Sequence, residues 1–407
     1  MSALPAWPLL ALCLLGAHAR AATHEDLQWH GYLDLRLQAD DDPSRGWREG
    51  GLAKFADGAA ATALLAARWQ PHPAWQAAAD LQVDSRSHPS AGVLEAWLRY
   101  RPVSLSSWRW SLRAGSFFPQ VSLENDGIGW TSPWTLSPSA INSWVGEELR
   151  STGLEYRLEH RRPSGRLELG LAGFLGNDPA GELLATRGWA LGDNTIALGG
   201  WLRQPDVHAT RARAQAPLWF QPFVETDHRL GWHADLAWIG AGERKLALMR
   251  YDNRADPASS ALQRGRRVFS WHTRFTSAGL RWPLGPHLLI AQAMSGSTAF
   301  EPRPGRYLDT RFESAFLLWA RDDGGPWRPA LRLDWFKTRE LGGAPGERMR
   351  REDGLALTAA LAWRPAPRWR ISGEWLWMHS DRDQRLLEDL PADGEARQLQ
   401  LSVRLLF

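Results

Sequence analysis

The sequence predicts an all-β fold, a transmembrane antiparallel β-barrel, and three observations carry this prediction. Segments of about ten residues alternate apolar and polar side chains along most of the chain, as strands with one apolar face do. The connections between these segments alternate between short turns and long loops. Many of the 25 tryptophans fall near the ends of the expected strands, where outer-membrane barrels carry aromatic girdles at the two lipid–water boundaries.

The first 22 residues have the features of a secretory signal peptide. The apolar run LLALCLLGA at 9–17 precedes the small-residue sequence AHARAA, so cleavage is expected near Ala19 or Ala22. Residues 23–407 would then form the barrel. Cys13 is the only cysteine of the chain and lies in this segment, so we expect neither disulfides nor thiolate chemistry in the mature protein.

The alternating pattern begins at once after this segment. In LQWHGYLDLRLQA the apolar Leu33, Leu35 and Leu37 alternate with Asp34 and Arg36, and the last residues, RQLQLSVRLLF, repeat the pattern. Strands are expected near 27–39, 59–70, 75–84, 93–101, 107–117, 149–160, 165–175, 183–191, 195–203, 228–239, 244–252, 268–281, 286–297, 310–320, 327–337, 353–363, 368–380 and 397–407. This makes about eighteen strands, and sixteen is the alternative count if 183–203 does not form a pair.

Loop lengths assign the two rims of the barrel. Short turns such as 162–165 and 283–286 are expected at the periplasmic rim, and long loops at the extracellular rim. An even number of strands places both termini at the periplasmic rim. A water-soluble β-sandwich or propeller is the alternative, and it would need a second layer to cover the apolar face of every strand.

If the apolar face of each strand meets lipid, the polar face lines the lumen. The 48 basic residues include only three lysines, and acidic residues number 45, so the net charge of +3 does not indicate nucleic-acid binding. A barrel this wide needs a water-filled channel or a plug, and no plug domain is expected before Leu27. The arginines predicted to line the lumen are Arg36, Arg99, Arg109, Arg113, Arg157, Arg166, Arg187, Arg274, Arg311, Arg332, Arg370 and Arg404.

The stretch at 118–148 follows neither the two-residue period of a strand nor the spacing of a helix. We expect this loop to fold into the lumen and narrow it, because irregular backbone at membrane depth is tolerated where it lines a water-filled cavity. Its candidate constriction residues, together with the arginine that follows the loop, are Glu124, Asp126, Trp130, Trp134, Trp144, Glu147, Glu148 and Arg150.

Three interpretations of these loop residues stay open. The acids could face Arg109, Arg113 and Arg150 across the constriction and create a transverse field for small solutes. The tryptophans could offer flat apolar faces to sugar rings. Alternatively, tryptophans and acids only anchor the loop to the barrel wall.

The segments EAWLRYRP (95–102), WRWSLRAGSFFPQVSLEND (108–126) and RSTGLEYRLEH (150–160) give the loop a family context. Over residues 95–160 the chain resembles the phosphate-selective porin O/P family and its uncharacterised relatives. The resemblance implies passive uptake of small anions through a trimeric pore. With only three lysines in the chain, it departs from the lysine cluster of that family, so we expect a weak anion preference.

The rest of the sequence does not predict catalysis. Ser270 and His272 share one strand face without a third catalytic partner, the histidines are scattered, and neither an enzyme, a metal site nor a cofactor is expected. The sequence therefore predicts a porin-like passive channel for small hydrophilic solutes, with a saccharide or polysaccharide channel, or a structural barrel sealed by its loop, as alternatives. Expected partners are outer-membrane lipid, lipopolysaccharide through basic clusters at 263–267 and 348–351, the barrel assembly machinery and two further copies in a homotrimer.

Overall fold

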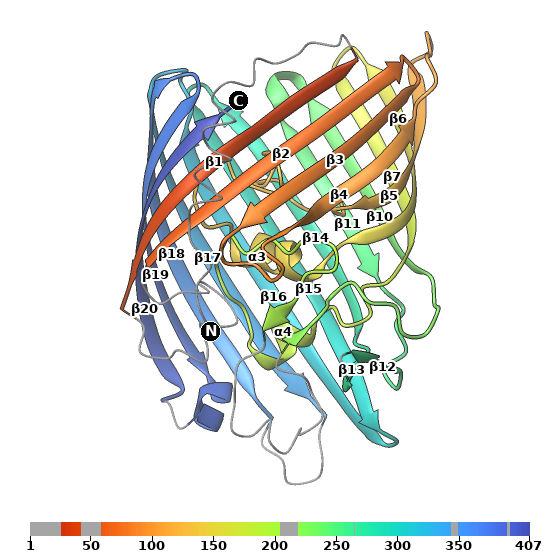
Figure 1. The fold of residues 1–407 in the computed structure, drawn as a ribbon, viewed down its shortest axis with the longest axis vertical. Helices are drawn as coiled ribbons and strands as arrows, with labels where there is room; N and C mark the ends of the chain where they lie inside the picture. Colours follow the sequence, from red (N-terminus) through yellow and green to blue (C-terminus); the bar gives the residue numbers. More distant parts are fainter. Residues whose placement is uncertain (1–25, 42–57, 204–218, 264, 343–348, 389–390) are drawn as a thin grey trace.

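The computed structural model describes residues 26–41, 58–203, 219–263, 265–342, 349–388 and 391–407, so the predicted signal peptide at 1–22 lies outside the described residues. The sheet closes into an antiparallel barrel of sixteen strands (Figure 1). This confirms the predicted fold class, and the number of strands is the alternative count of sixteen. The barrel strands are β1 (Leu27–Asp40), β2 (Gly58–His72), β3 (Trp75–Asp84), β4 (Ala91–Tyr100), β5 (Trp108–Phe117), β6 (Ser151–Arg162), β7 (Gly165–Leu175), β10 (Gly231–Gly240), β11 (Lys245–Asp252), β14 (His272–Leu284), β15 (His287–Arg303), β16 (Arg306–Arg321), β17 (Trp327–Leu341), β18 (Arg351–Ala366), β19 (Trp369–Arg382) and β20 (Asp393–Leu406).

The barrel closes where the last strand meets the first. β20 pairs with β1 from Tyr32 opposite Leu406 to Asp40 opposite Gln398. Gly31 and Phe407 exchange two backbone hydrogen bonds, of 2.9 and 3.1 Å. A Cβ on Gly31 would lie 2.5 Å from the Phe407 ring, so the terminal aromatic packs where only a glycine fits. Closure leaves no unpaired edge, which a sheet in lipid requires.

The region at 183–203 corrects the count of eighteen. It forms no barrel strand. Instead β7 pairs directly with β10, and this region holds the short helix α4 (Glu182–Thr186) and irregular backbone inside the barrel. The two-residue strands β8 (Leu202–Arg203) and β9 (Trp219–Phe220) form a separate ribbon, and β12 (Ser260–Gln263) and β13 (Arg266–Phe269) form another.

The outer surface carries the predicted apolar face. Leu35 and Leu37 are 61% and 59% exposed, as lipid-facing side chains are in the isolated chain. At the rim with the short turns the indoles of Trp327 and Trp363 stack with ring centroids 5.7 Å apart, and Trp108 is half exposed. This is the arrangement of an aromatic girdle.

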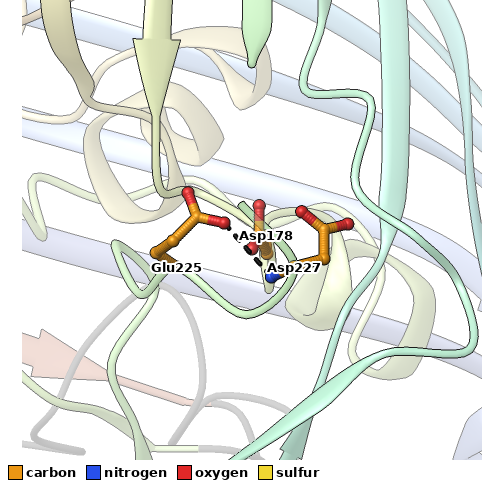
Figure 2. Close-up of side chains that lie close together, drawn as sticks. All are labelled: Asp178, Glu225 and Asp227. Carbon is orange, nitrogen blue, oxygen red and sulfur yellow. Dashed lines mark hydrogen bonds between the residues drawn. The ribbon is translucent and has the colours of Figure 1, made fainter. Parts of the chain in front are cut away.

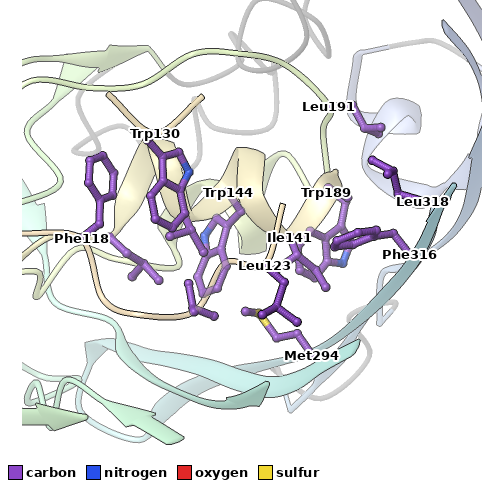
Figure 3. Packing of buried hydrophobic residues seen from close by; sticks show 14 of the residues in the cluster. Phe118, Leu123, Trp130, Ile141, Trp144, Trp189, Leu191, Met294, Phe316 and Leu318 are labelled. Carbon is purple, nitrogen blue, oxygen red and sulfur yellow. The ribbon is translucent and has the colours of Figure 1, made fainter. Parts of the chain in front are cut away.

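The lumen contains an apolar core in addition to polar side chains. A connected cluster of buried residues joins the inward-facing side chains of several barrel strands to segments folded inside (Figure 3). In the described part of the chain, the helical elements are α3 (Ala140–Glu148) and α4 inside the barrel, and the 3-10 turns η2 (Ala241–Glu243) and η3 (Asp383–Glu388) that follow wall strands. None of the described helices has the length and apolar character needed to cross a membrane.

Candidate functional site in the barrel lumen

Residues 118–150, which we call the first inward segment, leave β5 and fold into the barrel before β6 begins. Their helix α3 is buried along its whole length. The hydroxyl of Ser139 caps its start by accepting a hydrogen bond from the Asn142 amide at 3.3 Å. The segment therefore crosses the lumen as a packed element (Figure 1).

Arg332 of β17 holds this segment to the wall. Its fully buried guanidinium donates to Asp334 at 2.7 Å, to Glu124 at 3.2 Å and to the carbonyls of Ser137 and Pro138 at 2.6 and 3.0 Å. One wall arginine thus satisfies two carboxylates and two backbone carbonyls. Such a fully bonded buried ion pair fixes the segment in one position.

Two wall carboxylates accept the backbone amides that precede and open α3. Glu374 of β19 accepts from the amides of Leu136 and Ser137 at 2.5 and 3.0 Å. Asp334 accepts from the Ala140 amide at 3.1 Å. The first amides of a helix have no partner within it, and here acids of the barrel wall supply one.

The three loop tryptophans are buried. Trp130, Trp134 and Trp144 are 9%, 4% and 1% exposed. Trp130 stacks on Phe118 at 4.4 Å, and Trp144 lies 5.5 Å from the ring of Phe275 (Figure 3 shows the packing around both). Their faces contact protein, so the arrangement favours the anchoring interpretation over stacking on sugar rings.

The loop acids do not face the arginines that the sequence suggested. Glu124 contacts Arg332, Asp126 contacts Arg281 at 2.6 Å, and Glu147 contacts Arg187 at 2.7 Å. The sequence could not predict these partners because each lies on a separate element that only the folded chain brings close to the loop.

Glu148 is the exception, because its side chain makes no ion pair among the described residues. It accepts hydrogen bonds from the indole Nε1–H of Trp144 at 2.6 Å and from the Leu183 amide at 3.1 Å. Burial raises the pKa of Glu148 to about 7.

Residues 176–203 form a second inward segment, which the sequence did not reveal as such. Asp193 anchors it to the opposite side of the wall by contacting Arg36 at 2.5 Å and Arg86 at 2.7 Å. The two guanidinium groups hold the pKa of Asp193 well below its usual range. Glycines were the available signal, since positions 181, 188, 192, 199 and 200 interrupt a stretch that was expected to form two strands.

Arg150 lies between the two inward segments and not on an open pore wall. Its guanidinium donates to the Ile196 carbonyl at 2.7 Å and lies 3.3 Å from the centroid of the Phe118 ring. Burial lowers its pKa to about 9. Arg150 therefore joins the segments to each other.

A narrow polar gap separates the first inward segment from the wall formed by β20, β1, β2 and β3. Its volume is about 20 Å³, which accommodates about one water molecule. The gap is lined by Arg36, Arg86 and Asp193, with Trp130 and Arg404 among the other lining residues.

A larger cavity, the arginine vestibule, opens toward the rim with the short turns. It has a volume of about 370 Å³ and lies against β4, β5, β6 and β7. Arg113 pairs with Glu155 at 2.9 Å, whereas Arg99 and Arg109 contact no carboxylate within the described part of the chain. Its charged lining consists of Arg99, Arg101, Arg109, Arg113, Arg157, Arg161 and Arg166 against Glu155, Glu159 and Glu168.

The predicted lumenal arginines divide into two groups. Ten of the twelve line cavities or are buried inside the barrel, namely Arg36, Arg99, Arg109, Arg113, Arg157, Arg166, Arg187, Arg332, Arg370 and Arg404. Arg274 and Arg311 do not, because the buried Phe275 and Phe312 occupy the inward positions next to them. The prediction assumed that apolar faces always meet lipid, but here the inward segments provide an apolar interior.

The fold of the chain is similar to the folds of solved proteins. No protein-family model matches the chain, and no curated protein matches its sequence. Its fold is similar to OmpT, an outer-membrane protein of Vibrio cholerae, at a TM-score of 0.52 and 9% identity, covering 94% of this chain and 97% of that one. It is also similar to the outer-membrane channel DcaP of Acinetobacter baumannii, at a TM-score of 0.52 and 10% identity, covering 94% of this chain and 97% of that one.

An anion-selective porin from Comamonas acidovorans is similar at a TM-score of 0.50 and 10% identity, covering 94% of this chain and 99% of that one. At such identities the likeness establishes the fold, which is that of bacterial outer-membrane porins.

Proposed function

We propose that this chain is a passive channel of the bacterial outer membrane for small hydrophilic solutes, with a weak preference for anions. The observation that carries the proposal is the arginine vestibule, which places seven arginines against three glutamates inside a porin-like barrel. An excess of positive charge in a confined mouth raises the local concentration of anions. We also propose that the signal peptide at 1–22 directs export.

The proposed route runs from the vestibule past the first inward segment to the polar gap beside Arg36, Arg86 and Asp193. The opposite side of that segment is packed with apolar side chains, so hydrated solutes would follow the polar side. Because the gap holds about one water molecule, passage of solutes requires small displacements of Asp193 or its arginines. Low single-channel conductance is therefore expected.

Planar-bilayer recording tests both parts of this proposal. The wild type should show small stable conductance steps, and a salt gradient should give a reversal potential of the anion-preferring sign. Arg109→Gln should move that potential toward cations. Arg274→Gln removes the same charge from the outer face and should leave it unchanged. A cation-preferring wild type, or equal shifts in both variants, contradicts the anion preference.

A barrel sealed by its inward segments is the second candidate function, and the size of the polar gap favours it. In this case the wild type shows no conductance, while a protein lacking residues 118–148 conducts freely. This result would refute passive transport by the native chain.

The finer features implied by the resemblance are proposals as well. A phosphate-selective pore would be blocked by inorganic phosphate at concentrations where chloride has no effect. A saccharide channel would be blocked by maltodextrins in a way that Trp130→Ala abolishes, although burial of that indole disfavours this outcome. A homotrimer would give three times the mass of the chain in detergent, measured by light scattering.

A further inference from the structure

Three acids meet where the second inward segment begins and where the chain returns to β10. Asp178 follows the end of β7, and Glu225 and Asp227 lie just before β10 (Figure 2). One carboxylate oxygen from each lies within 4.8 Å of the others. β7 begins at the short turn 163–164 and ends at the opposite rim, so the three acids lie at the rim opposite the short turns.

One oxygen of this cluster has no hydrogen-bond donor although it is buried. Asp178 is 1% exposed, and its Oδ2 accepts from the amide and hydroxyl of Thr226 at 2.5 and 2.9 Å. Its Oδ1 accepts no hydrogen bond within the described residues. A buried carboxylate oxygen without a donor costs free energy, so a partner that binds this oxygen would stabilise the site.

The cluster also lacks the counter-charge that several other buried acids of this chain have. Asp84, Glu124 and Glu147 each contact an arginine at 3.2 Å or less. Asp178 and Glu225 contact no cationic side chain in the described ranges. Among the described residues, a salt bridge to the cluster comes from Arg229, which is about half exposed and whose Nε lies 3.9 Å from Asp227.

Backbone donors fix the other two carboxylates. Glu225 accepts from the amides of Gly176 at 2.7 Å and His228 at 2.6 Å, and Asp227 accepts from the Arg229 amide at 2.9 Å. The start of the second inward segment and the loop before β10 therefore present three carboxylates at one point, with Glu225 and Asp227 partly open to solvent.

We propose that Asp178, Glu225 and Asp227 bind a divalent cation of the Ca²⁺ class and thereby clamp the start of the second inward segment to the loop that precedes β10. The ligands are oxygens only, which hard cations prefer. Oxygens that share one Ca²⁺ lie about 2.3–2.6 Å from it, so they can be up to about 5 Å apart, and the observed 4.8 Å fits this range. Mg²⁺ at about 2.1 Å would require the oxygens to move closer.

The experiment measures binding directly and does not depend on conductance. The full-length mature chain is refolded in detergent free of lipopolysaccharide, stripped with EDTA and titrated with CaCl₂ by calorimetry. The wild type should bind one Ca²⁺ per chain, and Mg²⁺ should bind at least about tenfold more weakly. Absence of Ca²⁺ binding by the wild type would overturn the proposal.

Two variants test the ligands. Asp178→Asn retains an acceptor for Thr226 and should weaken Ca²⁺ binding at least about tenfold. Asp322→Asn removes an acid paired with Arg328 at the opposite rim and should bind as the wild type does. If Asp178→Asn does not refold, as judged by heat-modifiable gel mobility, the Ca²⁺ titration of Asp227→Asn replaces it as the test. Unchanged affinity in the deciding ligand variant would refute the site.

Discussion

The two inward segments fill the same lumen but are held to the barrel in different ways. The first, 118–150, packs aromatic side chains against the wall and is fixed by the buried Arg332. The second, 176–203, also has a buried contact to the wall, because the Trp189 amide donates to Glu352 of β18 at 3.0 Å. Beside the polar gap, however, it is held by Asp193, which pairs with Arg36 and Arg86. The comparison shows that packing and a fully buried ion pair hold the first segment in place. The part of the second segment beside the proposed route is held by charge pairs.

The largest effect is expected from removing the anchor of the first segment. Arg332→Met leaves the buried Glu124 and Asp334 without a counter-charge, which typically costs about 3–5 kcal/mol. We expect a lower unfolding temperature in detergent, followed by circular dichroism, and a larger conductance because the segment loosens.

A matched control is available on the same segment. Arg281→Met breaks the contact with the half-exposed Asp126, which should cost about 1 kcal/mol or less. If both variants are destabilised equally, burial of Arg332 is not what fixes the first segment, and the contrast between the two segments fails.

An intermediate effect is expected at the anchor of the second segment. Asp193→Asn removes the negative charge shared by Arg36 and Arg86, so the two arginines repel each other and the gap should widen. Bilayer recording should show a several-fold larger conductance and a stronger anion preference, with little loss of stability compared with Arg332→Met.

Asp126→Asn serves as the control for that measurement, because this acid lies away from the polar gap. It should leave the conductance close to that of the wild type. A conductance of Asp193→Asn that equals the wild-type value would show that the gap is not part of the route.

The strands were predictable because each barrel strand alternates side chains between two environments. The alternation does not say which environment is lipid. Phe275 and Phe312 face inward because they pack on Trp144, and Arg274 beside them therefore lies outside. Contacts such as Glu124 with Arg332 join residues far apart in the chain, so only the closed barrel reveals them.

Packing on Trp144 also explains why the sequence wrongly predicts two barrel strands at 183–203. Its own Trp189 packs against that indole with ring centroids 6.1 Å apart, so its apolar residues serve the lumenal core and not a lipid-facing strand. A sequence of apolar residues separated by glycines is compatible with either use. Only burial inside the barrel distinguishes a segment of the lumenal core from a lipid-facing strand, and the local sequence pattern does not show this burial.

The smallest effect concerns the contact between the two segments. Glu148 accepts from Trp144 in the first segment and from the Leu183 amide in the second, and its pKa of about 7 exceeds the ordinary value of 4.5. The folded state therefore holds more protons than the unfolded state between about pH 4.5 and 7, so stability should fall as pH rises through this window and level off above it.

Glu148→Gln keeps the shape of the protonated acid and should flatten this part of the profile of unfolding temperature against pH. Glu147→Gln is matched in size and position but removes the ion pair with Arg187, so it should lower the whole profile and retain the wild-type slope. A slope that persists in Glu148→Gln would assign the pH dependence to another group. In that case the join between the segments would depend on packing and not on a proton.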